Sequence, residues 1–397
     1  MQRTVEKMEV GRQTVEKVFF ALLRFEINGT ELCDAVKNAI TPELLPALYR
    51  LSKKHDLAHL VGDGLRRNGF LPDDSEAKKR FLHERNIAVY RYERIQYEYD
   101  QICEIFQAEG IAYIPLKGSV IRQYYPEPWM RTSCDIDILV AEKDLERAIE
   151  SLERSAGYER GEKCFHDVSL LSPCGVHLEL HYNLIEKDEK MDALLQDAWG
   201  YTVRENETRH LMDNEYLAFY LLSHMKHHFL KGGCGVRAFM DIYLLFRAVA
   251  INKERFLALC AQGGIEKLAK EALALSECWF ADKEPAPLTA KMGEYILNGG
   301  VYGTTENKVL LQQAKSGNRF KYVMSRIWLP YKWLKYSYPS LEGKRWLTFF
   351  YQVRRWFSII FRRKKVKKGL KEVSVSQQID KEQHEATKKL LRDLELD

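Results

Sequence analysis

The segment that most constrains the fold joins an apolar run, a glycine turn, a short helix and a strand that carries two carboxylates. The apolar run occupies residues 111–116 and leads into Gly118 and Ser119, and the strand is expected over Asp135–Val140. Because side chains alternate along a strand, Asp135 and Asp137 share one face of it, while the apolar residues between them face the core. Two carboxylates so close together repel each other unless a cation lies between them. The pattern therefore predicts a metal site on one face of a β-sheet.

The residues around this strand predict a phosphate ligand beside the metal. Magnesium or manganese prefers oxygen ligands and is usually completed by substrate phosphates. Gly118 and Ser119 open a short helix, and a glycine there lets the backbone approach a phosphate at the helix N-terminus. Lys117 and Arg131 flank the strand with two cations that neutralise charge on phosphoryl oxygens. We expect these four residues to hold a triphosphate; the alternative is an edge strand with solvated acids and ordinary surface bases.

A second strand supplies a third carboxylate. Over residues 176–184, His177, Glu179 and His181 alternate with apolar residues and so lie on one face. If this strand pairs beside Asp135–Val140, Glu179 points at the same metals. Asp135, Asp137 and Glu179 are then the predicted metal ligands and catalytic residues. Two ions held by three carboxylates activate an acceptor hydroxyl and stabilise a leaving pyrophosphate.

The composition is that of a soluble globular protein. The chain has 397 residues, enough for two or more domains, and 46% of them are hydrophobic and 29% charged. Its longest apolar runs fall far short of the roughly 20 residues that cross a bilayer, and residues 1–10 lack the apolar core of a secretory signal. The eight cysteines show no spacing typical of a disulfide framework or a thiolate zinc site. We expect a cytoplasmic protein with reduced thiols.

The order of the patterns predicts an α+β fold in which a small mixed β-sheet core is flanked by helical regions. The core occupies residues 111–190, between an N-terminal helical region, residues 1–110, and a helical domain, residues 191–317, that is helical from 191 to about 297. A basic aromatic helical region, residues 318–370, and a charged tail, residues 371–397, follow. Within the tail, residues 386–394 are expected to form one exposed helix.

Two further helices carry candidate site residues. His224, His227 and His228 lie at helix positions i, i+3 and i+4, a spacing that can hold zinc. The glutamate of the His-Glu-x-x-His pattern is missing, so histidines that contact the sheet or a nucleotide are the preferred interpretation. Arg237 and Asp241 are one helical turn apart and either pair with each other or serve the site.

The C-terminal region combines aromatic and basic residues. Residues 319–368 contain fifteen Lys or Arg against one acid, together with many Trp, Tyr and Phe residues. A helical domain whose aromatics form a core is the preferred interpretation. The alternatives are a membrane surface, where amphipathic side chains with basic heads are typical, and nucleic acid, on which aromatics stack. The sequence thus leaves membrane-surface or nucleic-acid contact through residues 319–368 open.

These motifs resemble a known family. The run Gly118-Ser119, Asp135-x-Asp137 and Glu179 resembles the nucleotidyltransferase superfold typified by DNA polymerase beta and the aminoglycoside nucleotidyltransferases. The wider set is more similar to an uncharacterised bacterial family, nucleotidyltransferase family 5. That set comprises Leu116-Lys117-Gly118, Arg131, Asp135-Ile-Asp137-Ile-Leu-Val140, Glu179-Leu-His181, His224-x-x-His227, Arg237-x-x-x-Asp241 and Tyr336 to Pro339. The resemblance covers about residues 44–355.

The resemblance implies the fold, metal dependence and the acids at matched positions. It also implies that the helices with His224, His227, Arg237 and Asp241 face the active cleft, so that these residues and His181 contact the nucleotide. One departure is the long gap before Asp135, so residues 125–133 are expected to bulge.

The expected function is metal-dependent transfer of an NMP from an NTP, with ATP the expected nucleotide, to an acceptor with release of pyrophosphate. Two alternatives are an Asp-x-Asp glycosyltransferase, disfavoured by the helical region before Gly110, and a catalytically silent nucleotide-binding or membrane-surface protein. The acceptor, the preferred NTP and the oligomeric state stay open at this point.

Overall fold

A five-stranded mixed β-sheet lies at the centre of the segment that carries the predicted carboxylates. The structure is a computed structural model and describes residues 2–186, 188–301, 303, 307–311, 324, 328–331, 334, 338–341, 343–361 and 381–396. The strands are β1 (Tyr113–Pro115), β2 (Asp135–Val140), β3 (Glu159–Lys163), β4 (Asp167–Leu171) and β5 (His177–His181). Their spatial order is β1-β2-β5-β4-β3. Strands β2 and β5 pair in parallel, and the other neighbours are antiparallel. The predicted α+β fold with a small mixed sheet is confirmed.

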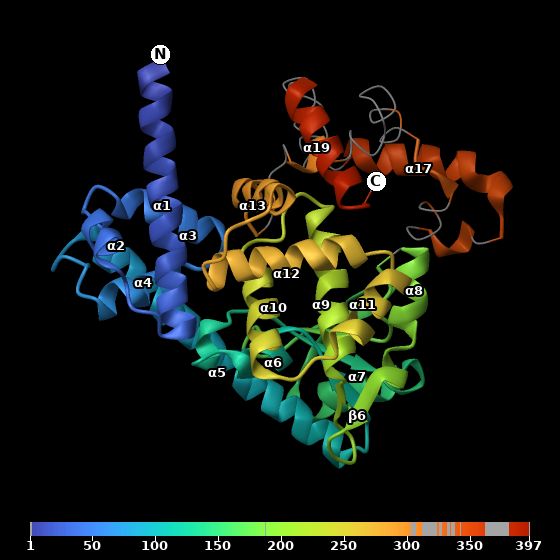
Figure 1. Cartoon of the computed structure of the whole chain (residues 1–397). Helices are drawn as coiled ribbons and strands as arrows, with labels where there is room; N and C mark the ends of the chain where they lie inside the picture. Colours follow the sequence, from blue (N-terminus) through green and yellow to red (C-terminus); the bar gives the residue numbers. More distant parts are fainter. Residues whose placement is uncertain are drawn as a thin grey trace.

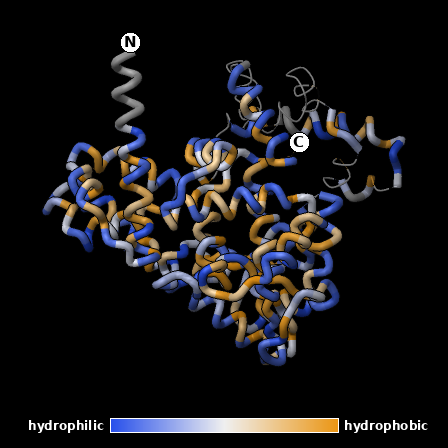
Figure 2. Tube along the Cα trace, in the orientation of Figure 1, coloured by the Kyte–Doolittle hydropathy of each residue, from blue (hydrophilic) through white to orange (hydrophobic). Residues whose placement is uncertain are grey.

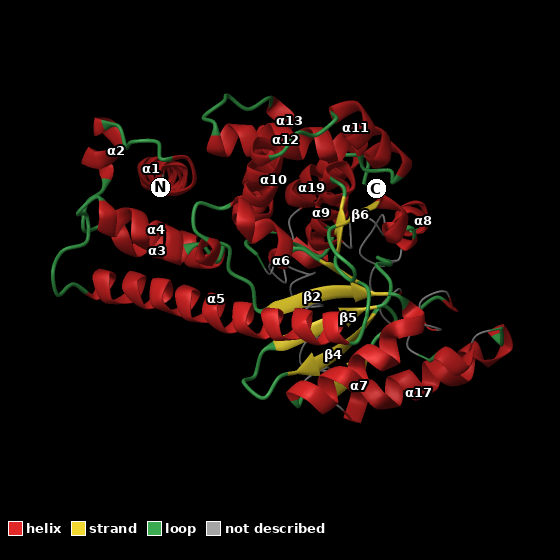
Figure 3. Cartoon of the chain, turned by 90° about the horizontal axis from the view of Figure 1, so that it is seen from below, coloured by secondary structure: helices red, strands yellow, loops and turns green. Residues whose placement is uncertain are grey.

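Two helices cover one face of this sheet. They are α5 (Glu76–Ala108) and α7 (Leu145–Ala156), which lie along the strands in Figure 3. Ile136, Ile138 and the alternate apolar residues of β5 pack against them in a closed apolar cluster. Because the side chains of β2 alternate, the carboxylates between these isoleucines project from the opposite face.

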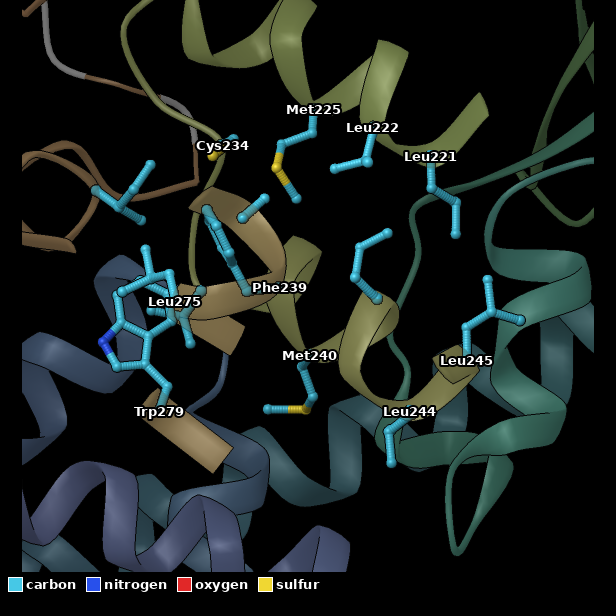
Figure 4. Close-up of a cluster of buried hydrophobic side chains, with 14 of the residues drawn as sticks. Leu221, Leu222, Met225, Cys234, Phe239, Met240, Leu244, Leu245, Leu275 and Trp279 are labelled. Atoms are coloured by element: carbon cyan, nitrogen blue, oxygen red, sulfur yellow. The ribbon is translucent and has the colours of Figure 1, made fainter. Parts of the chain in front are cut away.

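The opposite face of the sheet is covered by a larger helical layer. Its members are α6 (Gly118–Ile121), α8 (Glu189–Gln196), α9 (Asn214–Phe229), α10 (Arg237–Ala248), α11 (Lys253–Gln262), α12 (Glu266–Phe280) and α13 (Pro287–Gly299). Leu222 and Met225 of α9, Phe239 of α10 and Trp279 of α12 pack into one buried cluster, shown in Figure 4. This core fixes α9 and α10, which carry the predicted histidines and Arg237.

The N-terminal helical region forms its own group of helices beside this layer (Figure 1). It contains α1 (Gln2–Asn28), α2 (Asp34–Ala39), α3 (Leu45–Lys54) and α4 (Ala58–Arg67). Phe19 and Leu22 of α1 and Leu60 of α4 are fully buried between them. The turn between α3 and α4 brings Asp56 to the site described below.

The region expected to be helical from 191 to 297 contains a hairpin, so that prediction was wrong there. Strands β6 (Thr202–Arg204) and β7 (His210–Met212) are antiparallel. The side-chain oxygen of Asn206 accepts hydrogen bonds from the backbone N–H groups of Thr208 and Arg209, which closes the turn between them. Strands of three residues are too short for a periodic pattern to reveal.

Two described helices follow in the C-terminal part. Helix α17 (Thr348–Phe361) lies at the margin of the molecule, and α19 (Lys381–Asp393) lies beside α13 (Figure 1). Leu390, Leu391 and Leu394 join the main apolar core, so the exposed helix predicted over residues 386–394 is a packed one. None of the helices in the described ranges is long and apolar enough to cross a membrane.

Candidate functional site

Parallel pairing of β2 and β5 brings the predicted carboxylates together. The register sets Asp137 opposite Glu179 and Asp135 opposite His177. Side chains that are opposite in neighbouring strands and point the same way lie close together. The predicted approach of Glu179 to the carboxylates of β2 is therefore present, on the face turned toward α9.

Asp137 is the most tightly held group of the site. Its carboxylate Oδ1 accepts hydrogen bonds from Lys117 Nζ at 2.7 Å and from His181 Nε2 at 3.1 Å. Burial alone would raise the pKa of Asp137, but the Lys117 ammonium and the hydrogen bond from His181 outweigh it and hold that pKa well below its usual range. Asp137 is therefore ionised over the whole physiological range of pH.

The pKa of Asp135 is shifted in the opposite direction from that of Asp137. Burial and the nearby charge of Asp137 raise its pKa to about 6, against the attraction of Lys117. The raised pKa shows that a negative charge on Asp135 is repelled by the ionised carboxylate of Asp137. Any divalent cation that binds there relieves the repulsion and favours the charged form.

The residues present fit a divalent metal. Ligand atoms of Asp137, Glu179 and His181 all lie within 4.8 Å of one another. Two carboxylates suit magnesium or manganese, and an imidazole nitrogen is a better ligand for manganese than for magnesium. Asp135 lies outside this close group and His181 lies inside it, which differs from the predicted set of Asp135, Asp137 and Glu179. Glu179 keeps a side-chain exposure of 39%, so the group opens toward solvent.

The turn between β1 and α6 positions the side chain of Lys117 rather than backbone amides for a phosphate. Lys117 has a positive φ of 43°, which a residue with a side chain rarely adopts, and this conformation directs the chain from β1 into α6. The backbone N–H of Ser119 donates to the carbonyl of Leu116. Gly118 lines one of the two cavities described below, and Lys117 lines both. The predicted contact of Ser119 with a phosphate stays a prediction.

Arg131 and Asp241 form a buried two-pronged ion pair. Nε and Nη2 of Arg131 lie 3.0 and 2.8 Å from the two carboxylate oxygens of Asp241, and Tyr125 donates its hydroxyl to the same carboxylate at 2.6 Å. The side chains of Arg131 and Asp241 are only 10% and 6% exposed. The pair ties the loop before β2, which contains the predicted bulge, to α10.

Arg237 does not pair with Asp241, which was one of the two alternatives expected for it. It donates to Asp56 at 2.8 Å and to the carbonyl and hydroxyl of Thr132, both at 3.1 Å, instead of pairing with Asp241 one turn away. Asp241 is already bound to Arg131, so the two residues of α10 face different partners. Asp56, from the α3–α4 turn, thereby anchors the N-terminal helices to the site.

Two adjoining cavities open beside the carboxylates. One has a volume of about 470 Å³ and is lined by Gly118, Arg131, Ser133, Asp137, Arg237 and Asp241, among others. The other, of about 420 Å³, is lined by Phe165, His166, Glu179, His181, Glu186, Tyr220 and His227, among others. The wall common to both consists of Lys117, Asp135, His224, His228 and Lys231. The carboxylates therefore stand between a cation-rich cavity and a cavity lined by acids and imidazoles.

The chain matches one known protein family. Residues 42–281, more than half of the chain, match the family described as uncharacterised nucleotidyltransferase. The chain belongs to this nucleotidyltransferase family. No curated protein and no solved structure matches it. The match ends before Tyr336 to Pro339, so the expected resemblance there stays a prediction, and Tyr336 lies outside the described residues.

In this member of the family the predicted histidines converge on a glutamate that sequence reasoning missed. Glu186 follows β5 and lies 2.5 Å from Nδ1 of His227 and 3.4 Å from Nδ1 of His224. Nε2 of His228 lies 2.9 Å from Nε2 of His224. No periodic pattern marks Glu186, because it lies in a loop. These histidines are absent from the close ligand groups found among the described residues, which supports the interpretation that they form hydrogen bonds and line the site.

The histidines make the stability of this family member depend on pH. Burial lowers the pKa of His224 to about 4 and that of His228 to about 3, with Lys117 and neighbouring histidines adding to the shift. An unfolded histidine titrates near pH 6.5, so between pH 6.5 and 4 the unfolded chain binds protons that the folded chain does not. Stability is therefore lost as the pH falls, by roughly 2 kcal/mol for each histidine at pH 5.

Urea unfolding at pH 7 and pH 5 measures this effect. The variant His224→Gln/His228→Gln should lose less stability on acidification than the wild type, whereas His83→Gln, at an exposed position of α5, should behave as the wild type does. Equal losses in all three proteins would contradict the assignment. Groups that titrate in every variant, Asp135 included, cancel in the comparison.

Proposed function

We propose that this protein transfers an NMP from an NTP to an acceptor and releases pyrophosphate, with a divalent metal held by Asp137 and Glu179 together with Asp135 or His181. The observation that carries the proposal is the parallel register of β2 and β5, which sets two acids side by side at the boundary of two cavities. Family membership supports nucleotidyl transfer in general. The metal, when bound, would polarise the phosphoryl oxygens and neutralise charge that develops on them.

The cation-rich cavity is the proposed triphosphate site. Lys117, Arg131 and Arg237 line it together with Gly118, at which an added Cβ would lie 3.4 Å from both Arg131 and Ser133. Asp241 and Asp56 hold the two guanidinium groups in fixed positions without filling the cavity. Groups fixed before the substrate arrives need no reorganisation when charge develops, which is the arrangement that favours phosphoryl transfer. ATP is the proposed nucleotide.

The second cavity is the proposed acceptor site. It meets the first at Lys117 and Asp135, so an acceptor bound there would lie next to a nucleotide whose phosphates occupy the first cavity. In-line transfer would require the acceptor to approach the α-phosphate from the side opposite to the leaving pyrophosphate. An acceptor hydroxyl or amine would lose its proton to a carboxylate or imidazole of this wall as its bond to phosphorus forms and the bond to the pyrophosphate breaks. Glu179, half-exposed in this cavity, is the proposed acceptor of that proton.

Binding of an NTP with and without metal tests the proposal. Titration calorimetry of the wild type with ATP and Mg²⁺ or Mn²⁺ should give binding that weakens at least about tenfold in Asp135→Asn/Asp137→Asn, because a neutral amide holds a divalent metal much less tightly than a carboxylate does. The control Glu142→Gln/Asp144→Asn changes two acids with the same spacing just after β2 and should bind as the wild type does. Metal-dependent binding that is unchanged in the Asp135/Asp137 variant would refute the site.

The helices that precede the sheet disfavour the glycosyltransferase alternative. Such an enzyme needs a nucleotide-binding α/β half upstream of its Asp-x-Asp strand, whereas residues 2–108 form only α1 to α5 among their regular elements. A catalytically silent nucleotide-binding protein would bind ATP and metal in the same titration but release no pyrophosphate in the presence of acceptors.

A further inference from the structure

Most of the exposed large apolar side chains among the described residues belong to one stretch of the chain. Nine large apolar side chains are exposed among the described residues, and six of these lie between positions 324 and 357. Four belong to α17 and the turn before it: Trp346, Phe349, Phe350 and Phe357 are 75%, 56%, 63% and 57% exposed. Such a concentration is uncommon on a water-facing surface and marks a surface that meets something apolar.

Helix α17 carries aromatic side chains on two faces: Phe349, Tyr351 and Trp356 contact other rings of the chain, and a second set is exposed. Gln352 is buried and donates to the carbonyl of Leu329, and Tyr351 contacts Ser340 through a 2.9 Å hydrogen bond. Phe350 and Phe357, at positions i and i+7, lie together on the opposite side, with Phe349 at its margin. The inner face thus already has its partners within the chain, whereas Phe350 and Phe357 are exposed. The helix lies at the margin of the molecule (Figure 1) and contains both hydrophobic and hydrophilic residues (Figure 2).

The segment of the sequence that contains α17 carries charge of one sign. Residues 343–368 contain ten Lys or Arg and no Asp or Glu. Lys344 and Arg345 are exposed next to Trp346, and Arg354 is exposed between Phe350 and Phe357. An aromatic stripe bordered by cations is complementary to a surface that is apolar inside and anionic outside.

We propose that α17 binds the surface of an anionic lipid bilayer and lies in its plane, with Trp346, Phe350 and Phe357 in the interfacial layer and the bordering basic residues on the lipid head groups. The convex helix suits a flat bilayer, whereas single-stranded nucleic acid is bound in grooves whose bases stack one by one on aromatics. The contact is independent of the proposed nucleotidyl transfer, because none of these residues lines the two cavities.

Co-sedimentation of the full-length protein with lipid vesicles tests this proposal. The wild type should sediment with vesicles of phosphatidylcholine and phosphatidylglycerol, and much less with phosphatidylcholine alone or at high salt. In Phe350→Ser/Phe357→Ser the apparent affinity for anionic vesicles should fall at least about tenfold. Both side chains are exposed, so the fold should persist, with unchanged circular dichroism and unchanged binding of ATP and metal.

Helix α5 provides a matched control. Tyr90 and Tyr97 are each 61% exposed, seven residues apart, and have Arg94 between them, as Phe350 and Phe357 have Arg354. Tyr90→Ser/Tyr97→Ser should bind anionic vesicles within about twofold of the wild type. The proposal is overturned if the wild type does not bind anionic vesicles, if both double variants bind alike, or if the α17 variant instead loses binding to a single-stranded RNA.

Discussion

Replacing Lys117 with methionine is expected to destabilise the metal-free protein by about 3 kcal/mol at pH 7, and divalent metal is expected to restore much of that stability. Lys117 and Asp137 form a buried ion pair at 2.7 Å with side-chain exposures of 17% and 6%. Removal of one partner of such a pair leaves the other charge buried without compensation, which costs about 3–5 kcal/mol. We place the estimate at the low end because His181 also donates to Asp137.

A divalent metal should change the stability of a Lys117 variant and of an Asp137 variant differently. In Lys117→Met the acids of β2 and β5 stay together, so Mn²⁺ binds without competition from the ammonium and stabilises the folded state by mass action. In Asp137→Asn the ammonium of Lys117 is left without its anion and a metal ligand is lost. Both variants should therefore be less stable in EDTA, but Mn²⁺ should stabilise only Lys117→Met by more than it stabilises the wild type.

Urea unfolding in EDTA and in Mn²⁺ measures these differences. An equal response of the two variants to Mn²⁺ would show that the carboxylates of this face do not form the metal site. A Lys117→Met variant as stable as the wild type in EDTA would show that the ion pair contributes little.

Replacing Asp241 with asparagine should destabilise the protein by about 3–5 kcal/mol, since it leaves the guanidinium of Arg131 buried and unpaired. Tyr125 also loses an ionised acceptor for its hydroxyl. The same change should weaken ATP binding, because Arg131 would no longer be held at the wall of the triphosphate cavity. Both effects come from one contact between the loop before β2 and α10.

A neighbouring ion pair is the control. Arg237 and Asp56 are 21% and 27% exposed, so Asp56→Asn should cost about 1 kcal/mol. A double-mutant cycle with Arg131→Met then isolates the coupling between Arg131 and Asp241, which we expect to exceed about 2 kcal/mol. Chemical denaturation gives all of these values, and a cost for Asp241→Asn no larger than that for Asp56→Asn would contradict this account.

The sequence predicted the structure best where polar and apolar side chains alternate regularly along a strand. Strand β2 was predicted with its observed bounds because Asp135 and Asp137 alternate with buried isoleucines, and β5 was predicted for the same reason around Glu179. Pairing of these two strands was an assumption that the structure confirms, and their parallel direction was not predicted. Family membership follows from the same motifs.

What the sequence did not reveal depends on contacts between distant residues. Arg131 and Asp241 are separated by 110 positions, and Arg237 and Asp56 by 181, so no spacing pattern could assign these partners. Glu186 lies in a loop without periodicity, and its partner His224 is 38 positions away in the sequence. The close approach of His181 to Asp137 likewise needed the twist and register of the folded sheet.

A crystal structure of the protein with Mn²⁺ and an ATP analogue that cannot be cleaved between the α- and β-phosphates tests the central claim most directly. Anomalous scattering locates the manganese without ambiguity from other atoms. The account predicts manganese bound by Asp137 and Glu179, with Asp135 or His181 as a further ligand, and a triphosphate in the cavity of Lys117 and Arg131. Manganese bound away from β2 and β5, or a nucleotide outside both cavities, would contradict it.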